Sequence, residues 1–189
     1  MIPAAELRNS IAGALRLARF DSSALNAFNR TLEGFWRSFF AAVIVGPLQL
    51  LLSFEVAANS GGAARIGDDW PLGLLAFIVH WLAFPVVMLT VVDWLDRRHR
   101  FFVFLVALNW SNLVQVGLLL LVYSPAAAML LPAQLLRLVG SVAVAYILVY
   151  EWFIAKVGLD ISGGKAVAIV LLDSFIGAAI FALAAFGQQ

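Results

Sequence analysis

Five long apolar runs, separated by short polar segments, dominate the pattern of this 189-residue chain. Each run is close to the ~20 residues that an α-helix needs to cross ~30 Å of hydrocarbon at ~1.5 Å per residue. The pattern therefore predicts five transmembrane helices, at about residues 36–54, 71–92, 102–123, 130–153 and 166–186.

The segment before the first run has a different pattern. At ~100° per residue, one helical face between Pro3 and Phe20 is apolar, and it consists of Leu7, Ile11, Ala14, Leu15 and Ala18. The opposite face is basic, with Arg8, Arg16 and Arg19. Such a helix suits the headgroups of an anionic membrane surface, or it packs on the protein's own cytoplasmic loops. We therefore divide the chain into a cytoplasmic amphipathic region, 1–35, and a five-helix transmembrane domain, 36–189.

Composition supports a membrane class. The chain is 63% hydrophobic and 12% charged, whereas a soluble domain is ~25% charged. We expect an all-α, polytopic integral membrane protein. The net charge of +1 gives no basic footprint for nucleic acid. The absence of Cys excludes disulfides and thiolate metal sites.

The basic residues predict an orientation. Ten of the twelve Lys and Arg residues fall in the N-terminal region and the second and fourth loops; the exceptions are Arg65 and Arg137. The positive-inside rule then puts the N-terminus in the cytoplasm and the C-terminus outside, as in a bacterial inner membrane. Aromatic residues favour the same boundaries, because Trp36, Trp70, Trp94 and Trp152 fall near the ends of predicted spans.

Among the polar and ionisable residues inside the predicted spans, six are candidates for a polar network: His80, Asn109, Asn112, Gln115, Arg137 and Asp173. Those of the third span recur at i, i+3 and i+6, so they share one helical face. Estimated depths predict three pairs: Asn109 with Asp173, Asn112 with His80, and Gln115 with Arg137. If the fourth span begins instead at Leu135, Arg137 extends to the outer headgroups.

Two interpretations of these polar residues stay open. In the first, they form interhelical hydrogen bonds that stabilise helix packing, as is common in membrane bundles. A carboxylate near the midplane, such as Asp173, is also typical of a proton or cation relay, because an unpaired charge there costs at least ~2.5 kcal/mol. His80 adds a group with an ordinary pKa of ~6.5. On the fifth span, Ser174, Ala178 and Ala182 form a small-residue stripe suited to close helix packing.

Common catalytic motifs are absent from the sequence. There is no His-Glu-x-x-His, no Gly-x-Ser-x-Gly, and Gly163-Gly164-Lys165 lacks the rest of a P-loop. The only histidines, His80 and His99, fall in a span and in a loop, which disfavours a haem held by two histidines. We therefore expect no enzymatic activity, no cofactor and no metal.

The stretch Trp152–Ala166 ends one apolar run, contains the turn Gly158-Leu159-Asp160-Ile161-Ser162, and opens the next run. Together with five spans and an amphipathic N-terminal region, it resembles the Yip1 superfamily of small membrane proteins. The resemblance implies a non-enzymatic membrane organiser or partner-binding protein, and it carries over no site residues.

Two functions follow. The first is a non-enzymatic scaffold or accessory protein that binds lipids, a membrane-protein partner or further copies of itself. The alternative is a small transporter or ion-coupled channel that uses Asp173 and His80.

Overall fold

The computed structural model describes residues 2–59 and 66–186, which form helices and short turns with no strand among them. Five helical segments are long and apolar enough to cross a membrane: Leu32–Val56, Pro71–Trp94, Arg98–Leu130, Ala133–Leu159 and Gly163–Ala184. The prediction of an all-α chain with five helices suited to a membrane is confirmed.

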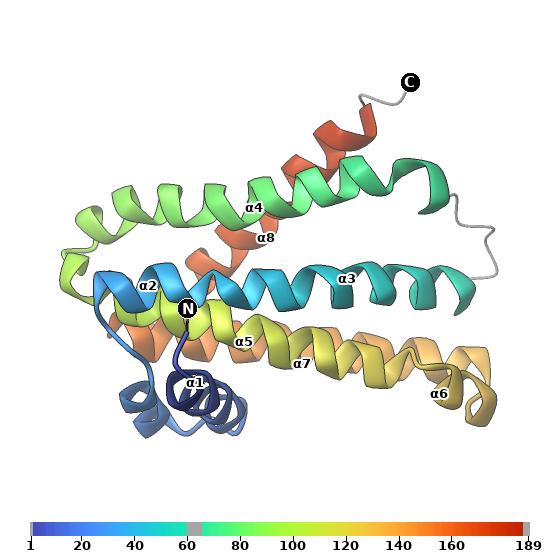
Figure 1. Cartoon of the computed structure of the whole chain (residues 1–189), viewed down its shortest axis with the longest axis horizontal. Coiled ribbons are helices and arrows are strands. Elements are labelled where there is room, and N and C mark those ends of the chain that lie inside the picture. Colours follow the sequence, from blue (N-terminus) through green and yellow to red (C-terminus); the bar gives the residue numbers. More distant parts are fainter. Residues whose placement is uncertain (1, 60–65, 187–189) are drawn as a thin grey trace.

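The helices in chain order are α1 (Ala4–Leu17), η1 (Ser22–Ala27), α2 (Leu32–Ser38), α3 (Phe40–Asn59), α4 (Ile66–Trp94), η2 (Arg98–Arg100), α5 (Phe101–Val122), α6 (Pro125–Leu130), α7 (Ala133–Leu159) and α8 (Gly163–Phe186). Figure 1 shows α3, α4, α5 and α7 running along the long axis of the molecule. In the same view α8 crosses them at an angle, and α1 is seen nearly end-on, so it lies across the bundle.

The centre of the bundle is α5. It packs against α1, α2, α3 and α7, whereas α8 packs against α4 and α7. The first half of α5 is apolar on nearly all sides and is buried without interruption from Val103 to Ser111, as expected of an enclosed helix. The contact between α5 and α7 is close, because a Cβ on Gly158 would lie 3.3 Å from the Cα of Phe104.

The fourth span lies later in the sequence than predicted. The chain forms the short helix α6, becomes extended at Leu131, and begins α7 after Pro132. Proline lacks a backbone N–H and suits a helix start rather than its interior. The helix α7 then continues to Leu159, where Asp160 adopts a left-handed conformation with φ 55°. Arg137 consequently lies in the second turn of α7, and Glu151 lies well inside it.

The N-terminal helix forms, and its packed face overlaps the expected one at Leu7, Ile11, Ala14 and Ala18 but not at Leu15. Ser10, Gly13, Ala14 and Leu17 are buried, whereas Leu15 is 50% exposed. The helix α1 packs against α5 and η1. Its Glu6 also forms a 2.7 Å ion pair with Arg37 of α2. Contact between α1 and lipid headgroups stays a prediction.

Candidate functional site

Four side chains from four different helices meet inside the bundle. His80 of α4 and Asp173 of α8 form a pair with 3.3 Å between Nε2 and Oδ1. Glu151 of α7 lies within electrostatic range of Asp173 and faces the side chain of Gln115 on α5. We call His80, Gln115, Glu151 and Asp173 the polar cluster.

The helix ends place the polar cluster deep in the bundle. At ~1.5 Å per residue from Trp94, Leu159 and Gly163, its ionisable groups lie about 12 to 21 Å inside. Close approach of α4 and α8 brings two of them together. A Cβ on Gly177, one turn after Asp173, would lie 3.3 Å from Cε1 of His80, so the glycine leaves room for the imidazole against α8.

Hydrogen bonding in the polar cluster is incomplete. Among the described residues, three of its buried atoms make no well-aligned hydrogen bond: His80 Nδ1, Gln115 Nε2 and Asp173 Oδ1. Within the same part of the chain, Asp173 Oδ1 has only the 3.3 Å pair with His80 Nε2, and Gln115 has only its contact with Glu151. Gln115 is only 8% exposed, and an unsatisfied buried polar group typically costs ~1–3 kcal/mol. The described residues contain no group of three or more acidic, His or Cys side chains arranged to hold a metal ion. The side chains of His80 and Asp173, with Glu151 near them, are groups that can share or exchange a proton.

The three predicted pairs are wrong in detail. Asn109 donates to Ser38 Oγ at 2.8 Å, and Asn112 donates to the carbonyl of Leu108 in its own helix at 3.0 Å. Arg137 is exposed near the start of α7, so the alternative of a fourth span that begins near Leu135 describes it better. At Asn109, α5 faces α2 rather than α8. The sequence pattern does not specify which helix is the neighbour at this position.

A second set of buried polar groups is complete. Tyr150, which is fully buried, donates to the carbonyl of Ala14 at 2.7 Å and is hydrogen-bonded to Ser111 Oγ at 2.7 Å. Ser38 Oγ accepts from Asn109 and donates to the carbonyl of Phe35 at 2.7 Å. We call these groups the satisfied network; it joins α1, α2, α5 and α7.

Sequence reasoning missed Glu151. The predicted fourth span ended at residue 153, which put this carboxylate at a membrane boundary. A signal was nevertheless present: Glu151 is the only charged residue between Ser141 and Ala155, an otherwise apolar stretch apart from two tyrosines.

The residues expected at the membrane surface have different surroundings. Arg8 and Arg19 are exposed, whereas Arg16 is bound to Asp21 with 2.7 Å between Nη2 and Oδ2. Hydrogen bonds from Ser23, and then Arg16, lower the pKa of Asp21. On α8, Ser174, Ala178 and Ala182 are all exposed, and Gly177 beside them faces His80 instead.

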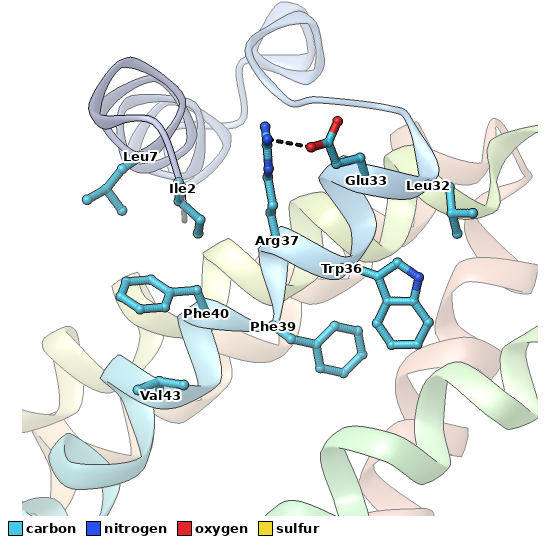
Figure 2. A pocket seen from close by; sticks show the side chains of 9 residues that line it. All are labelled: Ile2, Leu7, Leu32, Glu33, Trp36, Arg37, Phe39, Phe40 and Val43. Atoms are coloured by element: carbon cyan, nitrogen blue, oxygen red, sulfur yellow. Dashed lines mark hydrogen bonds and ion pairs between the residues drawn. The ribbon is translucent and has the colours of Figure 1, made fainter.

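An open groove of about 1120 Å³ lies between the start of α1 and the α2–α3 junction. Figure 2 shows its mostly apolar lining, with the ion pair between Glu33 and Arg37 as the charged element. The lining consists of Ile2, Leu7, Leu32, Glu33, Trp36, Arg37, Phe39, Phe40 and Val43.

No protein-family model matches this chain, and no curated protein or solved structure is significantly similar to it.

Proposed function

We propose that this chain is a non-enzymatic integral membrane protein that conducts or transports protons or monovalent cations through the polar cluster. The observation that carries the proposal is the meeting of two carboxylates, an imidazole and an amide from four apolar helices. Two carboxylates close together at low dielectric cannot both stay ionised at low cost. A proton or a cation bound between them relieves that repulsion. His80 can accept a proton from this site and pass it on.

Incomplete hydrogen bonding supports the same proposal. Polar groups that only hold helices together form complete hydrogen bonds, as the satisfied network does. In the polar cluster, by contrast, His80 Nδ1 has no hydrogen-bond partner among the described residues, and Asp173 Oδ1 has only the 3.3 Å pair with His80. Such loose pairing matches a site whose occupants exchange. The proposed setting is a bacterial inner membrane, with the N-terminus cytoplasmic because the basic loops favour that side.

The test is proton flux into proteoliposomes that contain a pH-sensitive dye, driven by a potassium diffusion potential. We expect Asp173→Asn and Glu151→Gln to reduce flux to the level of protein-free liposomes. Asp93→Asn is the matched control, because Asp93 lies at the end of α4 and pairs with Arg98 at 3.0 Å. A carbodiimide should modify the carboxyls of the polar cluster and block flux in the wild-type protein. Wild-type flux in both cluster variants would reject the proposal.

A second candidate is the scaffold or accessory role, in keeping with the Yip1-like layout. Two surface features favour it: the open groove of Figure 2, and the exposed stripe of Ser174, Ala178 and Ala182 on α8. Extraction into polymer nanodiscs, followed by mass spectrometry against an unrelated five-span control, tests it. A stoichiometric protein partner or homo-oligomer would favour the scaffold role, whereas an isolated chain would count against it.

A further inference from the structure

A small basic pocket lies at the end of the bundle, far from the polar cluster. Its volume is about 410 Å³, and it is lined by Arg30, His99, Arg100 and Val103. The helix η2 supplies His99 and Arg100, Val103 belongs to the first turn of α5, and Arg30 precedes α2. Segments distant in sequence thus bring two guanidinium groups and one imidazole to a single cavity.

The cationic groups of this pocket retain unused hydrogen-bond donors. Arg30 donates from Nη2 to the carbonyl of Leu25 at 3.2 Å and to the side chain of Asn26. Its Nε and Nη1 have no partner within the described part of the chain, and neither does His99. The one carboxylate near Arg100 is Asp160, at 3.7 Å and 71% exposed, so this pair is weak.

The backbone around the pocket adds to its positive potential. Arg100 is the N-cap of α5, and no side chain caps that helix. The helix η2 runs directly into α5, and the N–H of Phe101 donates to the carbonyl of Arg98. The positive end of the α5 dipole nevertheless lies at this turn and favours an anion there. Guanidinium groups are donors that proteins commonly use to bind phosphate.

The pocket also lies at a boundary between polar and apolar surface. The same turn carries Trp94, which is 83% exposed at the end of α4, and tryptophan is typical of membrane interfaces. Immediately after Arg100 the apolar sequence of α5 begins, and Val103 supplies the apolar wall of the pocket. A ligand seated here meets cations on one side and hydrocarbon-like surface on the other.

We propose that this pocket binds the phosphate group of an anionic phospholipid. Arg30 and Arg100 bind the phosphate oxygens, and His99 donates one further hydrogen bond. The parts of the acyl chains nearest the glycerol lie against Val103. The same phosphate chemistry could come from a soluble phosphate, so the experiment compares the two sources. This proposal does not depend on ion transport through the polar cluster.

The experiment is native mass spectrometry of the full chain in detergent, titrated with phosphatidylglycerol and, separately, with phosphatidylcholine. We expect preferential binding of phosphatidylglycerol. Arg30→Gln and Arg100→Gln should each weaken it by about tenfold, the effect of losing one charge-assisted hydrogen bond. Arg100→Lys should weaken it less, because it keeps the charge but not the bidentate geometry.

Arg98→Gln is the matched control, because Arg98 belongs to the same turn and is 75% exposed, but it pairs with Asp93 and does not line the pocket. Equal weakening by Arg98→Gln and Arg100→Gln would overturn the proposal in favour of general surface charge. No preference for phosphatidylglycerol would also overturn it. Displacement of the lipid by millimolar inorganic phosphate would support the phosphate site but identify a soluble phosphate as its ligand. Unchanged thermal unfolding of each variant confirms that the fold is intact.

Discussion

The satisfied network and the polar cluster both contain buried polar side chains of α5, yet they differ in how those side chains are paired. In the satisfied network, Asn109 and Ser111 bond to partners on α2 and α7. Only one turn further along α5, Gln115 faces Glu151, but its Nε2 makes no well-aligned hydrogen bond among the described residues. Complete pairing stabilises a fold, whereas incomplete pairing lowers stability and persists where a site serves another purpose. A single helix, α5, thus carries both hydrogen bonds that stabilise helix packing and one side chain of a candidate functional site.

The largest effect should come from removing the ionisable carboxyl of Asp173. Asp173→Asn keeps the size of the side chain and a hydrogen-bonding group for His80, so we expect a folded yield close to that of the wild type. Proton flux into proteoliposomes should be abolished, because an amide cannot release a proton. Folded yield and proton flux should be measured on the same preparation. A large loss of folded protein would show that Asp173 stabilises the fold, as the satisfied network does.

The next effect contrasts Tyr150 with Gln115. Tyr150→Phe leaves the Ala14 carbonyl and the Ser111 hydroxyl buried without this partner, which should lower the free energy of unfolding by ~1–3 kcal/mol. Gln115→Leu removes the contact with Glu151, but the amide nitrogen of Gln115 makes no well-aligned hydrogen bond in the described part of the chain, so this variant should lose less stability than Tyr150→Phe. Thermal unfolding in detergent measures both variants, and a larger loss of stability in Gln115→Leu would reverse the comparison.

A smaller effect is expected at the glycine that contacts His80. In Gly177→Ala the new methyl group would lie 3.3 Å from Cε1 and 3.4 Å from Nδ1 of His80, so the imidazole must shift by a few tenths of an ångström. We expect a partial loss of proton flux. Gly117→Ala on α5 is the control, because its added Cβ has no neighbour within 4 Å. The control should keep wild-type flux and gain up to about 1 kcal/mol of helix stability; equal flux in the two variants would contradict the role of Gly177.

The smallest effect concerns pH and a third region, the junction of α1 and η1. The pKa of Asp21 is lowered in the folded chain by Ser23 and Arg16, so its ionised form favours folding. This contribution is present above the ordinary pKa of 3.8 and is lost as pH falls through the lower folded value. Thermal unfolding between pH 7 and pH 3 should therefore show a slightly smaller acid destabilisation for Asp21→Asn than for the wild type. An identical pH dependence in the two proteins would refute this assignment.

Much of the helical layout could be predicted because the hydrophobic pattern determines it locally. The boundary of the fourth span could not, since the apolar run is continuous across Leu130 and Leu131 and the break depends on Pro132. That shift of α7 explains why Glu151 was missed and why Arg137 was given the wrong partner. The sequence identifies His80 and Asp173 as candidate site residues, but it does not predict that they pair with each other. Estimated depth in the membrane does not reveal which helices are neighbours.

The hydrophobic pattern is sufficient to predict the helical class, the five apolar helices and the candidate groups His80, Gln115 and Asp173. These properties follow from the local cost of placing polar groups in apolar surroundings. The packing of the helices in the folded chain brings α8 against α4, places α1 across α5, and adds Glu151 to the polar cluster. Neighbour choice depends on side-chain shape summed over whole helix faces, such as the space that Gly177 leaves for His80, and no periodicity in the sequence encodes it.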